Sequence, residues 1–365
     1  MRKTPLYQNH LEHEARMTDF SGFHMPVQFS RIQDEHMAVR QNVGIFDVSH
    51  MGEFLVEGAG ALDFLEKITT NRVAKLKVGQ AQYTLMCNPQ GGIIDDLLVY
   101  RLGEQSYMLV VNAGNIEKDW DWVIENKSLD TFTQNISDRM GLIALQGPKA
   151  KSILQRLGAE IEGLPNYYCK KGEIADYQDI LISTTGYTGS GGFELYVPVD
   201  DLEGLWDLLC AEGEREGLLR AGLGARDTLR LEMGYCLYGQ DIDEETTPLE
   251  AGLGWVTDLK KEYFIGKDAL IKQKSKGVVD QLKCFELEDK RVARPGFTIH
   301  RNDYKKIGVV RSGTFSPCLQ KPIGMGYVKV GLLKEDSRVM LSNGKKCFEG
   351  RIVKPPFVNV KDYGS

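Results

Sequence analysis

The stretch CFELEDKRVARPGFTIHRNDYKKIGVV, residues 284–310, decides the fold class of the C-terminal part of the chain. It holds three short strand-like runs, at 284–287, 296–300 and 306–310. Three more follow at 325–330, 339–341 and 347–353, with a turn at 342–344. Short runs at this spacing are typical of an all-β domain. We therefore predict a small β-barrel or jelly roll over residues 280–358.

Upstream of this stretch, strand-like and helix-like patterns alternate to about residue 260. Segment 59–68 has apolar residues at helical spacing, whereas 82–86 and 93–101 have the pattern of strands around a turn at 88–92. These patterns predict an α+β body over residues 1–270, with the change of domain near the polar stretch 272–277. The length of 365 residues predicts two or three domains.

Composition excludes several classes of protein. The chain has 45 basic and 51 acidic residues, and this net charge of −6 argues against a sequence-independent nucleic-acid binder. No apolar run approaches the ~20 residues of a membrane span. The start, MRKTPLYQNH, has the features of neither a signal nor a transit peptide. Seven cysteines without a CxxC pair favour the reducing cytoplasm of a bacterium. We expect no membrane or nucleic-acid partner.

Familiar catalytic signatures are missing from the sequence, among them the Walker A loop, GxSxG and HExxH. His10 and His13 have an i, i+3 spacing, but such a pair is more often a surface feature than a metal site. Ser49 and His50 could suggest the Ser/His pair of a hydrolase. Adjacent residues of an extended chain point apart, which argues against that interpretation. We therefore expect no metal.

The segment GGIIDDL, residues 91–97, places two adjacent acids in an apolar strand. Alternation sends their side chains to opposite faces, so one should face solvent or a partner and the other the interior or a cleft. A buried carboxylate is costly unless it is hydrogen-bonded or used. Two roles for the buried carboxylate stay open. It caps backbone amides of the turn, or it holds or deprotonates an amine.

Two further segments could contact a ligand. The loop TGYTGSGGFE, residues 185–194, has four glycines that permit close backbone approach and ends at Glu194, although an ordinary hairpin with a solvated Glu is the alternative. In GLGARDTLRLE, residues 222–232, Arg226 stands at a helix start, where a cation opposes the macrodipole. That position suggests an anionic or carbonyl partner. Helix-surface ion pairs explain Arg230 and Glu232.

The chain resembles the T-proteins of the glycine cleavage system, which are tetrahydrofolate-dependent aminomethyltransferases. The resemblance covers about residues 4–357 and depends on an ordered set of motifs. These are Thr4–Tyr7, Phe46–Glu53, Gly91–Leu97, Val111–Ala113, Gln146–Ala150, Thr185–Glu194, Gly222–Leu231, Leu237–Gln240 and Ser312–Pro317.

The resemblance implies three domains arranged as a cloverleaf around a folate cavity, two of them interleaved in the body. It implies transfer of the methylene of H-protein-bound aminomethyl-dihydrolipoyl to tetrahydrofolate, with release of ammonia. Matching positions make Asp96 the catalytic residue and Glu194 and Arg226 folate ligands. Other positions that match the cavity wall are Met51, Tyr83, Tyr100, Asn112, Tyr187, Tyr235 and Trp255.

Two alternatives within the same fold stay open. One is a tetrahydrofolate-dependent demethylase that acts on a small methylated amine or sulfonium compound. The other is a folate-binding protein of iron–sulfur assembly, whose Lys-Gly-Cys motif does not occur here. The tail beyond Phe357 departs from the family, so the residue that meets the glutamyl end of folate stays open, with Lys354 and Lys361 as candidates.

Overall fold

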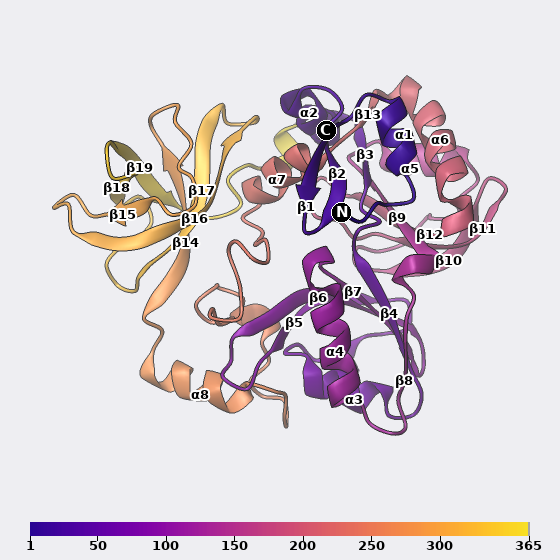
Figure 1. Cartoon of the computed structure of the whole chain (residues 1–365), viewed down its shortest axis with the longest axis horizontal. Coiled ribbons are helices and arrows are strands. Elements are labelled where there is room, and N and C mark those ends of the chain that lie inside the picture. The colour runs from indigo at the N-terminus through magenta and orange to yellow at the C-terminus, as the bar shows by residue number, and fades with distance from the viewer. Residues whose placement is uncertain (364–365) are drawn as a thin grey trace.

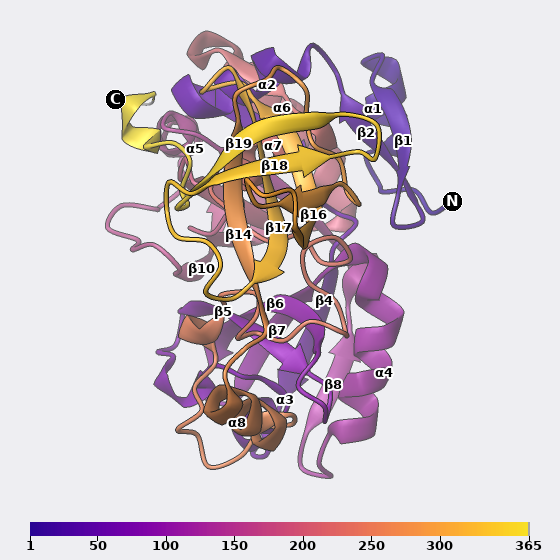
Figure 2. The same cartoon turned by 90° about the vertical axis from the view of Figure 1, so that its left-hand side faces the viewer.

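The computed structural model describes residues 1–363 and consists of an α+β body followed by a closed β-barrel. The predicted fold class is confirmed. Figure 1 shows the barrel on one side and the two large sheets of the body on the other, one above the other. Figure 2, turned by 90°, shows the barrel in front of the body. No helix within residues 1–363 is both long and apolar enough to cross a bilayer.

The first large sheet has six strands and packs its core against helices. Its order is β10 (Cys169–Ile174), β11 (Tyr177–Ser183), β12 (Gly192–Pro198), β9 (Met140–Gln146), β3 (Val43–Asp47) and β13 (Leu218–Arg220). Helices α5 (Ala150–Arg156) and α6 (Leu202–Gly213) bury Ile153, Leu205 and Trp206 against one face of it. The hairpin β11–β12 pairs Ser183 with Glu194 and therefore holds the glycine loop between them.

The second large sheet has five antiparallel strands. Its order is β5 (Ala81–Cys87), β6 (Ile93–Gly103), β7 (Ser106–Val111), β4 (Gly52–Glu57) and β8 (Phe132–Asn135). Leu97 and Val99 of β6 face helices α3 (Ala61–Ile68) and α4 (Ile116–Asn126). Leu98 and Tyr100 face a core shared with the first sheet. Alternate side chains of β6 thus pack into two different cores, one on each face of the sheet.

The remaining elements connect these layers. Helices α1 (Tyr7–Glu12), α2 (Ile32–Gln41) and α7 (Leu223–Glu232) and the hairpin β1 (Arg16–Phe20)–β2 (Phe23–Gln28) flank the six-stranded sheet. Short 3-10 helices occur at Val73–Lys75, Ala113–Asn115, Ser137–Arg139, Val199–Asp201, Glu214–Glu216, Gly254–Val256 and Val360–Asp362.

The C-terminal strands close into a barrel in the order β14 (Asp280–Leu287), β17 (Lys321–Lys329), β16 (Lys306–Ser316), β15 (Thr298–His300), β18 (Arg338–Ser342) and β19 (Cys347–Val353). The β-rich runs of the sequence correspond to these strands, which close into a barrel and not a jelly roll. The polar stretch 272–277 lies at the end of helix α8 (Lys267–Lys276), which leads into β14.

Helix α7 attaches the barrel to the body through buried charges. Arg230 donates to Asp241 Oδ2 at 2.6 Å and to Ser312 Oγ of β16 at 3.0 Å. Glu232 accepts from Ser316 Oγ at 2.6 Å. Arg230 forms an i, i+3 ion pair with Asp227 at 2.7 Å, as helical spacing predicts, although it is buried. Glu232 is buried and pairs with Arg40 of α2, so its assignment to a helix-surface ion pair was wrong. Helical spacing identifies neighbours on the same helix, whereas here a second domain covers that face.

Candidate functional site

A cavity of about 490 Å³ lies where the two sheets, helix α7 and the barrel meet. It is lined by nine of the ten site residues expected from the sequence. These are Met51, Tyr83, Asp96, Asn112, Tyr187, Glu194, Arg226, Tyr235 and Trp255. Side chains far apart in the sequence therefore share one hollow.

Tyr100, the tenth expected residue, does not line the cavity and is fully buried. Its hydroxyl makes a 2.8 Å hydrogen bond with Thr185 Oγ1, which in turn donates to Glu194. The cause is the six-stranded sheet, which covers this end of β6 and packs Tyr196 against Tyr100. Tyr100 thus stands behind the cavity wall.

Asp96 extends from β6 into the cavity and is held by two donors. Tyr83 donates its hydroxyl to Asp96 Oδ2, and Asn112 donates Nδ2 to Asp96 Oδ1, both at 2.9 Å. Burial and the neighbouring charge of Asp95 raise the pKa of Asp96 to about 7. A carboxyl group with such a pKa can both accept and donate a proton near neutral pH.

Asp95, on the other face of β6, is fully buried. It accepts hydrogen bonds from the backbone N–H of Asn112, from Asn112 Nδ2 and from Asn115 Nδ2, at 3.0, 2.8 and 2.6 Å. Asp95 does not face solvent or a partner, so that part of the expectation was wrong. Asp96 faces the cavity as a cleft residue should, while Asp95 packs where α4 begins. The two asparagines that flank Ala113-Gly114 were the sequence signal for this support.

Glu194 and Arg226 approach the cavity from β12 and α7. Burial raises the pKa of Glu194, while Thr185 Oγ1, 2.5 Å from Glu194 Oε2, and the charge of Arg226 oppose that rise. The Arg226 guanidinium stands 4.6 Å from the centre of the Tyr187 ring. Within residues 1–363 it makes no side-chain hydrogen bond or ion pair, and its N–H donors are free for a ligand. Burial lowers the pKa of Arg226.

Aromatic rings form flat walls on two sides of the cavity. Tyr83 and Trp255 stack with ring centres 6.0 Å apart and an angle of 25° between their planes. Tyr187 and Tyr235 lie 5.8 Å apart at 30°. The Tyr187 hydroxyl is bonded to the backbone oxygen of Cys236. Trp255 is 72% exposed, which places it at the mouth of the cavity.

Of the two lysines considered for the far end of a folate, only Lys354 reaches the cavity. Its Nζ pairs with Glu335 Oε2 at 2.6 Å. Lys361 lies beside Arg40 and Ser190 in a separate hollow. Lys283 of β14 adds a second cation to the barrel side of the cavity.

His10, His13 and His50, which the sequence raised as metal or hydrolase candidates, each have surroundings of a different kind. His10 pairs with Asp47 at 2.8 Å, while His13 bonds to a backbone oxygen. His50 is buried, and burial and the charge of Arg226 lower its pKa to about 4. Ser49 Oγ bonds to backbone atoms of Leu142 on β9, away from the imidazole.

One group of possible metal ligands gathers elsewhere, at the junction of α2, α7 and the barrel. Single ligand atoms of His36, Glu232 and Cys318 lie within 4.8 Å of one another. Arg40 already donates to Glu232 Oε2 at 2.8 Å. The guanidinium of Arg40 takes up acceptor positions of this carboxylate and neutralises its charge, both of which a metal cation would need. The group is therefore an ion-pair cluster.

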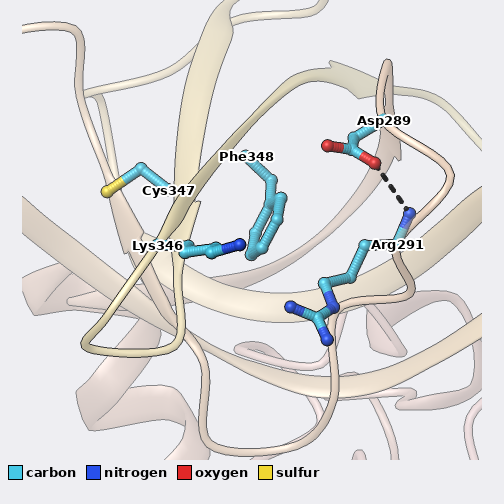
Figure 3. A pocket seen from close by; sticks show the side chains of 5 residues that line it. All are labelled: Asp289, Arg291, Lys346, Cys347 and Phe348. Carbon is cyan, nitrogen blue, oxygen red and sulfur yellow. Dashed lines mark hydrogen bonds between the residues drawn. The ribbon is translucent and has the colours of Figure 1, made fainter.

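A third hollow lies on the barrel and shares no lining residue with the central cavity (Figure 3). Arg291, Lys346 and Phe348 line it, with the guanidinium 5.6 Å from the centre of the Phe348 ring. Asp289 accepts from the backbone N–H of Arg291 at 3.2 Å. This part of the barrel surface therefore carries exposed cations.

Comparison with known proteins gives consistent matches along the chain. Residues 6–261 match the GCVT N-terminal domain family, and residues 281–359 match the glycine cleavage T-protein C-terminal barrel domain. A relative from Halothermothrix orenii named aminomethyltransferase is 50% identical, over 98% of this chain and 100% of its own. One of the same name from Phocaeicola vulgatus is 46% identical, over 98% and 99%. The crystal structure of glycine cleavage system aminomethyltransferase T from Bartonella henselae matches with a TM-score of 0.92 at 33% identity, over 98% of each chain.

Proposed function

The chain belongs to the family of glycine cleavage T-proteins and is an aminomethyltransferase, and we propose that its central cavity brings tetrahydrofolate to the aminomethyl group carried by lipoyl H-protein. The methylene passes to tetrahydrofolate, ammonia leaves, and 5,10-methylene-tetrahydrofolate and dihydrolipoyl H-protein result. The observation that carries the proposal is that Asp96, Glu194 and Arg226, from three different elements, line one cavity.

The pterin edge of folate complements Glu194 and Arg226. That edge has N–H donors at N3 and the 2-amino group and a carbonyl acceptor at C4. A carboxylate accepts from the two donors, and a guanidinium donates to the carbonyl. The unpartnered Arg226 guanidinium supports this assignment, as does the free Oε1 of Glu194, which makes no side-chain hydrogen bond within residues 1–363. The tyrosine and tryptophan walls match a flat ring system.

The reaction needs positioning, exclusion of water and a negative charge, and no protein nucleophile. The C–N bond of the aminomethyl group breaks with its electron pair leaving on ammonia, and one folate nitrogen attacks the sulfur-bound cationic carbon that results and loses its proton. The C–S bond then breaks with its electron pair on sulfur, which takes up a proton as the dihydrolipoyl thiol, while the second folate nitrogen bonds to the same carbon and loses its proton. Ionised Asp96 stabilises that cation and can accept the proton that the attacking folate nitrogen loses. Tyr83 and Asn112 fix its two oxygens for this purpose. The cavity excludes water around the reacting atoms.

Replacement of Asp96 by Asn tests the catalytic assignment. The amide keeps the shape of the side chain but carries no charge, so turnover should fall by about 10²–10⁴-fold. Calorimetry should still detect tetrahydrofolate binding, because Glu194 and Arg226 are unchanged. Asp63→Asn, an exposed substitution on α3, is the matched control. Near-wild-type turnover of Asp96→Asn would remove Asp96 from the mechanism.

The source of the one-carbon group distinguishes the proposed function from that of a demethylase. An aminomethyltransferase takes it from lipoyl H-protein, and a demethylase takes it from a small methylated compound. Aminomethyl-loaded H-protein and small methylated amines are offered in parallel assays with tetrahydrofolate. Formation of 5,10-methylene-tetrahydrofolate only from H-protein supports the proposal, and turnover only of a free amine would replace it with the demethylase.

The charge of the barrel would favour a carrier whose docking surface is acidic. Residues 280–358 hold 16 Lys and Arg and 8 Asp and Glu, a net charge of +8. The whole chain has −6, which leaves −14 for the rest. Added salt should therefore raise the KM for the carrier more than that for tetrahydrofolate. Lys346→Glu should do the same, whereas Lys272→Glu on α8 should not. Equal KM values for all three proteins would exclude docking near Lys346.

The cysteines agree with a cytoplasmic enzyme of this kind. All seven are free thiols in the structure, and five of them are buried. Burial raises the pKa of Cys87, Cys169 and Cys284, which keeps these thiols protonated and unreactive. A reducing compartment such as the bacterial cytoplasm is part of the proposed function.

A further inference from the structure

A row of buried hydroxyl groups leads from Glu194 into the interior, and only its first member, Thr185, lines the cavity. The Tyr196 hydroxyl donates to the Tyr100 hydroxyl at 3.0 Å, and Tyr100 bonds to Thr185 Oγ1 at 2.8 Å. Thr185 donates to Glu194 Oε2. Tyr196 and Tyr100 are fully buried, and Thr185 is 4% exposed. We call Tyr196, Tyr100 and Thr185 the hydroxyl chain.

The hydrogen bonds of the hydroxyl chain have a fixed direction when Glu194 is ionised. A carboxylate only accepts, so the single proton of the Thr185 hydroxyl points to Glu194. Tyr100 must then donate to Thr185, and Tyr196 to Tyr100. Ser183 Oγ lies 2.8 Å from Thr185 Oγ1 and 3.3 Å from the Tyr100 hydroxyl, so it adds a second donor to the row. Each donation polarises the next group toward the carboxylate.

We propose that the hydroxyl chain positions Glu194 and holds it as an acceptor, and thereby makes the cavity selective for ligands with two adjacent N–H donors, such as the 2-amino-4-oxo edge of a pterin. Thr185 occupies one acceptor position of Oε2, so Oε1 and the other acceptor position of Oε2 remain for two adjacent donors. This inference rests on the proposed function, since it concerns the same carboxylate. Tyr100 is a positioning residue in this scheme and does not touch the ligand.

The electrostatics around Glu194 agree with that geometry. Burial raises the pKa of Glu194, while Thr185 and Arg226 of α7 oppose the rise. Tyr100, Tyr196 and Tyr167 also face the carboxyl, and burial raises the pKa of all three, so they stay neutral donors. Removal of the Thr185 hydroxyl should therefore raise the pKa of Glu194 further. A larger fraction of Glu194 is then protonated at neutral pH and offers a donor where the ligand also offers one.

Thr185→Val and Thr185→Ser are a matched pair for the test, because both side chains are small and only Ser keeps the hydroxyl. Affinity for tetrahydrofolate is measured by anaerobic calorimetry from pH 6 to 9. Thr185→Val should bind about tenfold or more weakly at pH 7 and recover part of the loss as the pH rises, because a larger fraction of Glu194 is then ionised. Thr185→Ser should restore most of the affinity. In steady state the KM of Thr185→Val for tetrahydrofolate should rise more than kcat falls.

Tyr100→Phe removes one hydroxyl without emptying the core and gives a second, independent variant. It should weaken binding less than Thr185→Val, by about threefold, because Ser183 still donates to Thr185. Thermal unfolding of each variant shows that it is folded at the assay temperature.

Glu194→Ala separates failure of this inference from failure of the proposed function. Unchanged tetrahydrofolate affinity in Glu194→Ala would refute the proposed pterin site as a whole. If Glu194→Ala binds weakly but Thr185→Val binds as the wild type does, the hydroxyl chain has no role in binding. An equal loss in Thr185→Val and Thr185→Ser that does not change with pH would also overturn it, because packing alone would explain that result.

Discussion

Replacement of Asp95 by Asn should lower the pKa of Asp96 and move the pH dependence of turnover toward acid. Burial and the charge of Asp95 together raise the pKa of Asp96 to about 7, against the hydrogen bonds from Tyr83 and Asn112. The amide has nearly the shape of the carboxylate and lacks its charge. In the proposed reaction Asp96 acts in its ionised form. Wild-type turnover should therefore fall as the pH drops through about 7.

The size of the shift follows from the geometry around Asn112. Its Nδ2 donates to Asp95 Oδ1 at 2.8 Å and to Asp96 Oδ1 at 2.9 Å, so these two oxygens are at most about 6 Å apart. Two unit charges at that separation repel by about 3 kcal/mol at an effective dielectric constant of about 20. One pKa unit corresponds to about 1.4 kcal/mol, so the pKa of Asp96 should fall by about 2 units.

The assay is the initial rate of 5,10-methylene-tetrahydrofolate formation from aminomethyl-loaded H-protein between pH 5 and 9. The acid limb of the profile should have its midpoint near pH 7 in the wild type and about 2 units lower in Asp95→Asn. Asp63→Asn should reproduce the wild-type profile. A midpoint in Asp95→Asn that equals or exceeds the wild-type value would refute the electrostatic account of Asp96.

Three further substitutions test the packing around the site by urea unfolding. Gly92→Ala would put a methyl group 1.8 Å from a backbone oxygen, so it should cost about 3 kcal/mol or more, whereas Gly103→Ala, with 3.5 Å of space, should be tolerated. Arg40→Met leaves Glu232 buried without its ion pair and should cost about 3–5 kcal/mol. Burial raises the pKa of Glu53 well above 4.5, so wild-type stability should decline as the pH rises past 4.5 toward the raised value. Glu53→Gln should remove that decline and gain at least about 1 kcal/mol at pH 8; an unchanged slope would show that Glu53 is ionised in the folded chain.

Local patterns predicted the barrel because strand alternation and turn residues are properties of short segments. They were also right that Asp95 and Asp96 point to opposite faces of β6; in the structure Leu98 and Tyr100 share the face of Asp96. They could not predict what covers that side. The cavity opens over Asp96, while the six-stranded sheet closes over Tyr100. Which layer lies above a given residue depends on contacts between distant segments.

The three central site residues illustrate the same limit. The sequence indicated Asp96, Glu194 and Arg226 separately as candidate site residues. Asp96 is an acid in an apolar strand, Glu194 ends a glycine loop, and Arg226 is a cation at a helix start. Their convergence in one hollow was expected only from the family resemblance, because no spacing in the sequence links β6, β12 and α7. The supports of these residues, Asp95 and Thr185, were missed in that role because each acts through a partner from another element.

Helix α7 has a double attachment with a thermodynamic consequence. Arg226 lies in the cavity wall. One turn further along α7, Arg230 donates a hydrogen bond to Ser312 of the barrel. A displacement of the barrel that moved Arg230 would therefore reach the guanidinium of Arg226 through a single helical turn. Linkage makes such an effect reciprocal: an event at the barrel that changes affinity in the cavity by some factor must itself be changed by occupancy of the cavity by the same factor. Helix α7 is the element through which such a coupling between barrel and cavity would act.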